Sequence, residues 1–368
     1  GFGTRFIRSD FNNVEQVEVL KGVQGVLYGS VGLAGLVNLV SKTPTFERQG
    51  SINVQGGNGD LIAGSVDYTD RLSDKTAYRA VLSAQNDRQI TFDGLHNERF
   101  SAFGSATHRF TKTVSFTGLV EYVYVDESLL GGTWFDQATG RPAQGGKYVK
   151  RNSSIASDSY FTDETVRLNG RLDVAMNPDW NLRLTGSHYD QEFIRNQSDD
   201  RFIPLPADGT LTRLDANYLT EGKFTDVALD ITGEFDVGGI KNRLVMGASA
   251  RRYINFDHIW VWNTWTTNIS VPEHTLPKFG TRAPYWFTQV AETKAYDYGA
   301  YFLNTSSFMN DKLLFVYGVR YAWNDQGGGL VNLGAFGDTT PVAPFQKETV
   351  PNKDVKRGMS DEPLVRFG

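Results

Sequence analysis

The sequence predicts an all-β protein, a transmembrane antiparallel β-barrel. Three features of its 368 residues indicate this fold. Apolar and polar residues alternate downstream of about Gly50, turn residues interrupt the alternation at regular intervals, and the connections alternate between short and long. A barrel wall with lipid outside and water inside alternates in this way, so its average hydropathy stays low. A mean hydropathy of −0.36 with 21% charged residues is therefore compatible with a membrane protein.

Residues 14–43, VEQVEVLKGVQGVLYGSVGLAGLVNLVSKT, form the first expected element. They read as a short strand, a turn region stepped by glycines and a second strand. A transmembrane helix over 22–41 is disfavoured by the many glycines together with Gln24 and Asn38. A nucleotide-binding loop is disfavoured too, because the spacing is G-x-x-G-x-x-G and not G-x-G-x-x-G.

This segment resembles the end of the plug domain of TonB-dependent outer-membrane siderophore receptors. In that family an acidic, alternating strand ends in V-L-K/R-G and is followed by L-Y-G, spaced glycines and a V-N-x-V/I-x-K strand. Leu20-Lys21-Gly22 is closer to the siderophore branch than to the glycan branch, where L-K-D-A is usual. Val23 and Ala34 depart from the family's usual Pro and Gly. The matching motif residues are Gly22, Leu27, Tyr28, Gly29, Gly32, Gly35 and Asn38.

The rest of the chain predicts about eleven strands with one apolar and one charged face. Around Arg167, for example, the neighbours Val166 and Leu168 are apolar. Charges this dense suit a water-filled lumen better than the packed interior of a soluble sandwich. The expected strands cover 50–57, 61–72, 76–89, 98–110, 113–127, 164–176, 180–196, 218–237, 242–260, 293–309 and 312–326.

The connections between these strands alternate in length, which predicts the orientation of the barrel. Outer-membrane barrels have short periplasmic turns and long outer loops. The expected short turns are 72–75, 111–113, 177–179, 238–241 and 310–312. The expected outer loops lie near 90–97, 128–163, 197–217, 261–292 and from 327 onward.

The resemblance implies a plug remnant over 1–47 and the first half of a barrel over 48–368, since family members close with twenty-two strands. No export signal is visible at Gly1, which we interpret as truncation. The implied function is TonB-dependent transport of ferric siderophores across the outer membrane of a Gram-negative bacterium. Outer loops and the plug apex would capture the ligand, and TonB would displace the plug through an N-terminal box absent here. The implied partners are the ferric siderophore, TonB and outer-membrane lipid, with iron carried as cargo and no cofactor.

The outer loops are expected to bind the ligand because they are rich in aromatic residues. Ferric siderophores are compact, partly apolar and often anionic, so aromatic faces with a few cations can bind them. Packing within each loop, or a place in an aromatic girdle, is the alternative for each aromatic residue. The candidates are Trp134, Phe135, Tyr148, Trp260, Trp262, Trp265, Lys278, Arg282, Tyr285 and Trp286.

Charged residues on the plug strand are expected to pair with charges on the lumen face of the barrel. Each such pair in a water-accessible lumen stabilises the plug by only about 0–1 kcal/mol, which suits a plug that must move. Solvated, unpaired charge is the alternative. The candidates are Glu15, Glu18 and Lys21 on the plug and Glu121, Arg167, Arg171, Asp230 and Glu234 on the barrel.

Catalysis and nucleic-acid binding have little support. The chain has no cysteine, which excludes disulfides and thiolate chemistry, and its net charge of −5 disfavours a nucleic-acid partner. Its five histidines are scattered without metal-ligand spacing. We therefore expect neither an enzyme nor a metal site. The alternatives left open are a receptor for haem, cobalamin or a glycan, a passive porin and, least favoured, a soluble β-sandwich.

Overall fold

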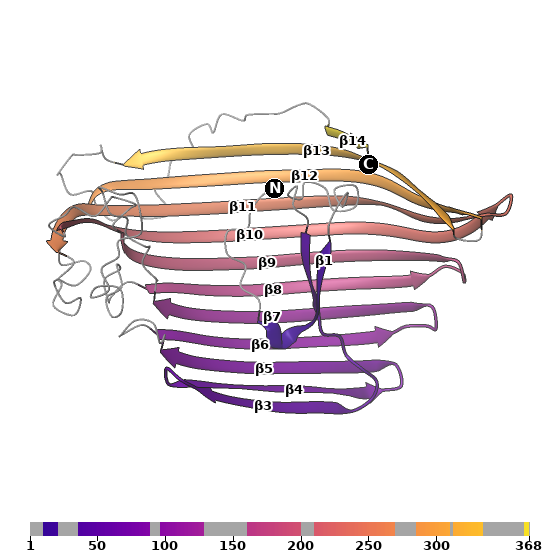
Figure 1. Ribbon diagram of the computed structural model, residues 1–368, viewed down its shortest axis with the longest axis horizontal. Helices are drawn as coiled ribbons and strands as arrows, with labels where there is room; N and C mark the ends of the chain where they lie inside the picture. The colour runs from indigo at the N-terminus through magenta and orange to yellow at the C-terminus, as the bar shows by residue number, and fades with distance from the viewer. Residues whose placement is uncertain are drawn as a thin grey trace.

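The computed structural model describes residues 10–20, 36–88, 96–128, 160–199, 210–268, 285–309, 312–333 and 364–367. A short 3₁₀ turn, η1 (Phe11–Asn13), leads into a two-stranded sheet of β1 (Val14–Leu20) and β2 (Leu36–Ser41). The remaining strands form one twelve-stranded antiparallel sheet in chain order (Figure 1). We call these two sheets the plug sheet and the wall. Among the described residues, no helix is long and apolar enough to cross a membrane.

The wall is built of hairpins, each strand pairing with the next. Its strands are β3 (Gln49–Gly57), β4 (Leu61–Ser73), β5 (Thr76–Arg88), β6 (His96–Arg109), β7 (Val114–Ser128), β8 (Tyr160–Ala175), β9 (Trp180–Asp199), β10 (Thr210–Val237), β11 (Ile240–Asn268), β12 (Tyr285–Phe308), β13 (Leu313–Leu333) and β14 (Leu364–Phe367). The fold class expected from the alternation is confirmed.

The two faces of the wall differ as the alternation predicts. Glu121 of β7 lies opposite Arg167 of β8, while their neighbours Val120 and Leu168 face each other on the other side. Val120 and Leu168 are both about half exposed, whereas Glu121 is buried. We call the face with Glu121 and Arg167 the inner face. The apolar outer face is suited to lipid contact.

The expected short turns lie at one end of the wall, which we call the short-turn end; the short β3–β4 connection lies at the other end. At the tightest of them, Gly238 and Gly239 join β10 to β11 with φ values of +61° and +81°. A two-residue hairpin turn of this kind needs positive φ at both positions, which glycine adopts without steric cost. The Asp236 carboxylate accepts a hydrogen bond from the Gly239 N–H at 2.8 Å and holds the turn closed.

The expected outer loops are shorter than predicted, because strands β8 to β13 continue into them. β10 starts at Thr210 instead of 218, and β11 runs to Asn268 instead of 260. Consequently Trp260, Trp262 and Trp265 lie in β11, and Tyr285 and Trp286 lie in β12. The ladder continues because cross-strand pairing satisfies the backbone groups beyond a bilayer as well as within it. One strand more than the eleven expected is present, the four-residue β14.

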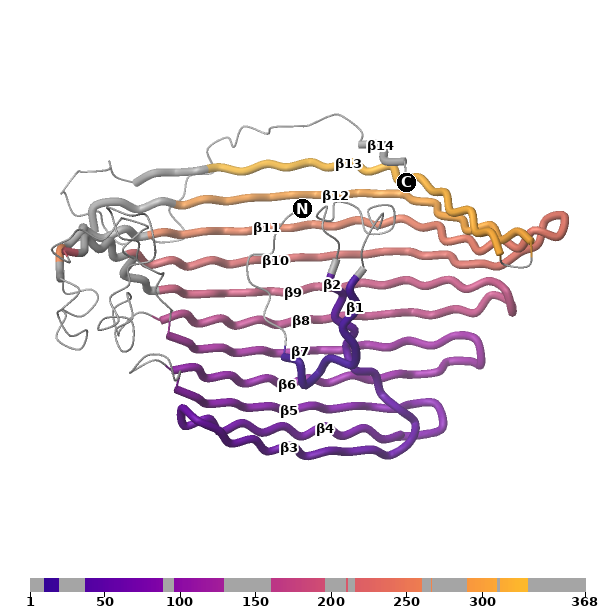
Figure 2. Tube along the Cα trace, in the orientation of Figure 1, coloured from indigo at the N-terminus to yellow at the C-terminus, as the bar shows by residue number. Residues whose placement is uncertain are grey.

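The plug sheet lies across the inner face of the wall instead of extending it. Figure 2 shows β1 and β2 crossing the direction of the wall strands. Hydrogen bonds join this segment to β4, β5, β7 and β8, as described below. The chain then runs from Ser41 through 42–48, which we call the linker, into β3. This arrangement positions the candidate site between plug sheet and wall.

Candidate functional site

A cluster of charges fastens the linker to the first wall hairpin; we call Lys42, Asp67 and Arg79 the linker cluster. Asp67 of β4 accepts hydrogen bonds from the Arg79 Nε at 2.8 Å and Nη2 at 2.7 Å. The Lys42 Nζ approaches the same carboxylate at 2.7 Å. Arg79 also donates to the Thr43 carbonyl at 3.2 Å. A bidentate pair with a second cation is geometrically specific, so it sets the linker's position.

Three further contacts extend this attachment toward β3. The Thr45 N–H donates to the Thr69 hydroxyl at 2.9 Å, and the Arg48 Nε donates to the Asp70 carboxylate at 2.7 Å. Phe46 packs under Arg109 of β6, whose guanidinium carbon lies 3.7 Å from the ring centroid. The linker is therefore bound to the wall along most of its length.

A second cluster, formed by Asn13, Ser41, Glu121 and Arg167, binds the plug sheet itself. Glu121 is 3% exposed; its carboxylate accepts a hydrogen bond from the Asn13 side-chain amide and forms an ion pair with Arg167, whose Nη2 lies 2.6 Å away. Arg167 also donates to the Ser41 hydroxyl at 3.2 Å. We call this the Glu121 cluster. Burial makes it sensitive to loss of a single partner, because an unpaired buried charge is costly.

Asp10 provides a neighbouring contact ahead of the plug sheet. Its carboxylate accepts hydrogen bonds from the Ser83 hydroxyl on β5 and from the backbone N–H of Asn12 at 2.9 Å. Asp10 thus caps η1 and attaches it to the wall at the same time. Together with Glu121 it holds the start of β1 against the inner face.

The structure distributes the expected plug–barrel charges unevenly. Glu121 and Arg167 contact the plug segment, and Glu15 lies 3.6 Å from Arg79. Glu18 instead bonds Asn38 at 2.9 Å within the plug sheet. The other three pair within the wall: Arg171 with Asp173, Asp230 with Tyr301 and Glu234 with Arg243. Lys21 lies outside the described residues.

Three residues with a plug-side contact were not expected from the sequence: Lys42, Asp67 and Arg79. A signal existed, since Asp67 and Arg79 occupy inner-face positions and Lys42 is the closing lysine of the V-N-x-V-x-K strand. Among the motif residues, Asn38 lies on β2 opposite Glu18. The other motif residues, Gly22, Leu27, Tyr28, Gly29, Gly32 and Gly35, lie outside the described part of the chain.

The aromatic ligand candidates fall into two groups. Trp134, Phe135, Tyr148, Lys278 and Arg282 lie outside the described residues. The backbone register of the others places Trp262 of β11 opposite Tyr285 of β12, and Trp260 and Trp265 opposite Asn217 and Arg213 of β10. Trp286 follows Tyr285 on β12. The neighbouring strands β11 and β12 thus bring these five residues to the same end of the wall.

An aromatic cluster on the inner face was not anticipated. The Tyr189 and Phe224 rings stack with centroids 5.2 Å apart, and Arg195 lies 5.2 Å from the centroid of Tyr218. Nearby, the Phe161 and Phe193 centroids are 5.6 Å apart. The alternation places these residues on the inner face of β8 to β10, between the Glu121 cluster and the long connections. This pattern could have identified them from the sequence. We call these six residues the inner aromatic cluster.

The described histidines have structural partners. His96 contacts Asp126 at 3.2 Å and Ser128 at 2.8 Å, and His108 and His188 contact Thr76 and Thr225. In the described ranges, no group of three or more histidines and carboxylates is arranged to hold a metal ion. His274 lies outside those ranges.

The sequence matches curated receptors over most of its length. No family model matches. The metal-pseudopaline receptor CntO of Pseudomonas aeruginosa is 26% identical over 338 residues, covering 90% of this chain and 46% of the relative. The ferrioxamine B receptor of Salmonella typhimurium is 28% identical over 251 residues, covering 64% and 33%. The chain thus spans a third to about half of the length of these curated relatives.

Solved structures agree with the fold. The siderophore receptor PiuA of Acinetobacter baumannii matches with a TM-score of 0.76 and 17% identity, covering 90% of this chain and 50% of that one. The ferric-catecholate import receptor Fiu of Escherichia coli, closed form, matches with a TM-score of 0.77 and 18% identity, covering 97% and 51%. The resemblance first seen in residues 14–43 is therefore confirmed: the chain is similar in sequence to receptors for siderophores and a metal chelate, and it has the fold of siderophore-receptor barrels.

Proposed function

We propose that the protein takes part in TonB-dependent transport of ferric siderophores across the outer membrane of a Gram-negative bacterium. Its function would be transport and not catalysis. The supporting observation is a plug sheet bound to the inner face of a barrel wall, in a chain whose curated relatives are receptors for siderophores and a metal chelate. The apolar outer face is suited to lipid and the charged inner face to a hydrated lumen.

Ligand capture would occur at the end of the wall opposite the short turns. The strand extensions with Trp260, Trp262, Trp265, Tyr285 and Trp286 would form part of the site, together with Trp134, Phe135, Tyr148, Lys278 and Arg282. Below them the inner aromatic cluster would offer a second set of apolar faces. Aromatic rings bury large areas with little loss of conformational entropy, and a nearby arginine adds attraction for an anionic chelate.

Passage would require the plug sheet to leave the inner face. The polar contacts of the Glu121 cluster can be exchanged for contacts with water when the sheet moves, so the bound state is held without a large apolar interface. No nucleotide motif was found in the sequence, and the energy would come from TonB in the inner membrane. We propose a plug domain over 1–47 and a barrel domain over 48–368, with the linker 42–48 at their junction.

Uptake of ferric chelates tests this function. The gene that carries this sequence would be expressed in full in an iron-starved host lacking other siderophore receptors, with and without TonB. We expect one or a few ⁵⁵Fe-labelled siderophores to accumulate only with TonB. Accumulation of cobalamin, haem or a glycan instead would refute the cargo, and TonB-independent entry of small solutes would refute the mechanism in favour of a porin.

A further inference from the structure

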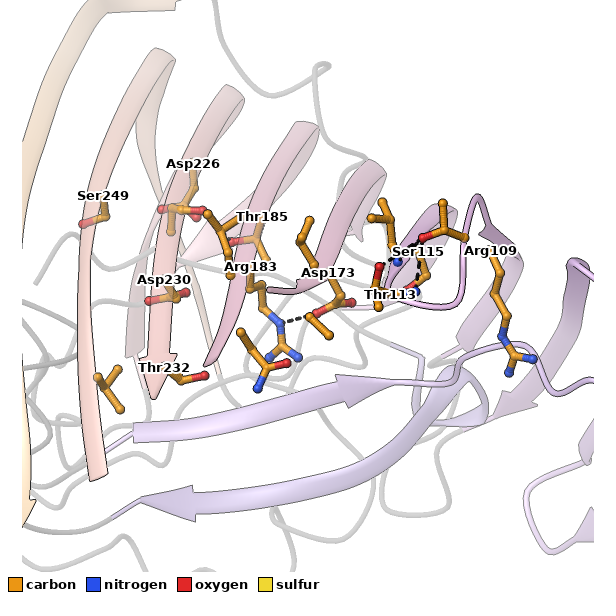
Figure 3. Close-up of a pocket in the computed structure, with 18 of the residues that line it drawn as sticks. Arg109, Thr113, Ser115, Asp173, Arg183, Thr185, Asp226, Asp230, Thr232 and Ser249 are labelled. Atoms are coloured by element: carbon orange, nitrogen blue, oxygen red, sulfur yellow. Dashed lines mark hydrogen bonds and ion pairs between the residues drawn. The ribbon is translucent and has the colours of Figure 1, made fainter. Parts of the chain in front are cut away.

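A large cavity lies on the inner face near the short-turn end of the wall. It has a volume of about 700 Å³ and is lined by residues from the β6–β7 turn and from β7 to β12. Figure 3 shows Thr113, Ser115, Thr185 and Ser249 among the polar residues around it. A volume of this size can accommodate a small-molecule ligand. We call it the short-turn cavity; it is separate from the aromatic residues at the opposite end.

The carboxylates that line the short-turn cavity already have partners. Asp173 accepts hydrogen bonds at 2.7 Å from both Arg171 and Arg183 (Figure 3 shows the Arg183 bond). Asp226 accepts one from Arg251 at 2.9 Å. Asp230 accepts one from the Tyr301 hydroxyl. Arginines of the wall therefore compensate the charges of Asp173 and Asp226, whereas Asp230 has a neutral hydroxyl as its partner.

Two cations of the same lining are not compensated. Within the part of the chain that the structure describes, neither Arg109 nor Lys112 forms an ion pair with a carboxylate. Phe46 of the linker fixes the Arg109 side chain, with the guanidinium carbon 3.7 Å from the ring centroid. A cation held on an aromatic face keeps its N–H donors available to a ligand. The β6–β9 side of the cavity is therefore cationic.

Hydroxyl groups complete this cationic side. Thr111, Thr113 and Ser115 lie on or next to the β6–β7 turn, and Thr185 lies across from them on β9. An adjoining cavity of about 490 Å³ shares Arg109 and Ser115 and reaches the linker. Cations interspersed with hydroxyls match ligands that carry carboxylate, phenolate or similar oxygen anions.

We propose that the short-turn cavity is an exit-side binding station for an anionic metal chelate, contacted by Arg109 and Lys112. This inference rests on the proposed transport function and names a second ligand site, between the plug and the periplasm. The exposed cations remain hydrated, so binding is weak and falls with salt concentration. Weak binding suits a transient site, because the chelate must dissociate from it.

Uptake measurements on charge variants give the first test. We expect the double variant Arg109→Gln/Lys112→Gln to bind an anionic ferric tricarboxylate or catecholate at the cell surface as the wild type does, but to take it up about 3–10-fold more slowly, a change of about 1 kcal/mol in the barrier. Uptake of an uncharged ferric trihydroxamate should be unchanged. The charge-preserving variant Arg109→Lys/Lys112→Arg should retain most uptake. Lys75→Gln, in the β4–β5 turn outside the cavity lining, is the matched control.

Crystals of the purified full-length protein soaked with ferric citrate give the direct test. We expect an iron anomalous peak in the short-turn cavity near Arg109 that disappears in Arg109→Gln/Lys112→Gln. Absence of that peak in the wild type, or its persistence in the double variant, would overturn the inference. If no ferric chelate is taken up in a TonB-dependent manner, the proposed function fails, whereas the soak reports on the cavity independently of transport.

Discussion

Glu121 lies in an environment that differs from that of an exposed lumen charge. Its side chain is 4% exposed and its Arg167 partner 23%, whereas the Glu234–Arg243 pair on the same face is 63% and 74% exposed. An exposed pair stabilises a fold by about 0–1 kcal/mol, but removing one partner of a buried pair costs about 3–5 kcal/mol. The contribution of each ion pair to stability therefore depends on how buried its position on the wall is, and not on charge alone.

Arg167→Met should loosen the plug because it leaves the Glu121 carboxylate buried without its cation. We expect the free energy that holds the plug against the wall to fall by about 3 kcal/mol. Cells should then become more sensitive to vancomycin, which intact outer membranes exclude. The double variant Arg167→Met/Glu121→Gln should restore most of the resistance to vancomycin, because a neutral amide can still form a hydrogen bond with Asn13. Arg243→Met is the control and should have little effect. Equal sensitivity in the two single variants would show that burial of Glu121 has no role.

Gly299 makes room for a buried arginine on the inner face. Arg320 of β13 is 2% exposed, and a Cβ at Gly299 of β12 would collide with its guanidinium group. Arg320 lies 3.7 Å from Asp297 and donates to Ser249 at 3.1 Å. A side chain at Gly299 would displace this cation from both partners.

Gly299→Val should therefore reduce folding yield, with a lower temperature for loss of the heat-resistant form on gels. The expected cost is about 2–4 kcal/mol, as for other disrupted buried polar networks. Gly327→Val on β13 is the matched control, since a Cβ there meets nothing within 4 Å. A similar loss in both variants would mean that strand propensity, and not the Arg320 site, is responsible.

From the sequence, the alternation predicts which face of the wall a residue occupies, but it does not predict that residue's partner. The period of two assigns Arg167 and Glu121 to the inner face, and both contact the plug segment. It could not identify Arg79 as the partner of Lys42 and Asp67, because the crossing position of the plug sheet on the wall is fixed by three-dimensional packing. The expected pairing of Glu18 with the wall competes with a local bond to Asn38, which is directly opposite on β2.

At the scale of elements, the strands are predictable but their outer ends are not. Within the bilayer, lipid on one side and water on the other impose strict alternation. Beyond it both faces are wet, so the segment IWVWNTWTTN of β11 loses the alternation that marked the strand. Its backbone nevertheless remains paired, Trp265 with Arg213 and Trp262 with Tyr285. The tryptophans are thus held on a strand ladder and not on a free loop.

Replacing residues 262–286 by an Asn-Gly turn would test this extension as a ligand-binding element. The remaining pairs of β11 and β12, ending at Val261 and Phe287, are left intact, so barrel assembly should be unchanged. We expect ferric siderophore affinity, measured on cells without TonB, to fall by at least about tenfold, or about 1.4 kcal/mol. The same replacement of residues 89–95 between β5 and β6 is the control. Unchanged affinity would place the ligand site elsewhere.

At the scale of the whole molecule, the proposed transport depends on how the plug sheet is attached to the wall. The glycine-stepped motif and the alternation indicate both parts from sequence, yet neither indicates how they meet. The structure gives two attachments of different kinds. The linker cluster holds Lys42 and Thr43, just after β2, whereas Glu121 of β7 and Ser83 of β5 bind Asn13 and Asp10 ahead of β1. Only the second attachment has to break if the plug sheet moves away.

Engineered disulfides test this claim most directly, because the chain has no cysteine of its own. Asp10→Cys/Ser83→Cys would lock the plug segment to β5, and Thr45→Cys/Thr69→Cys would lock only the linker; the hydroxyls of Thr45 and Thr69 are 3.5 Å apart. We predict that oxidation of the first pair stops TonB-dependent uptake, leaves surface binding of the siderophore intact and is reversed by dithiothreitol, while the second pair transports in both states. Uptake at the wild-type rate through a fully cross-linked Asp10→Cys/Ser83→Cys protein would contradict the account.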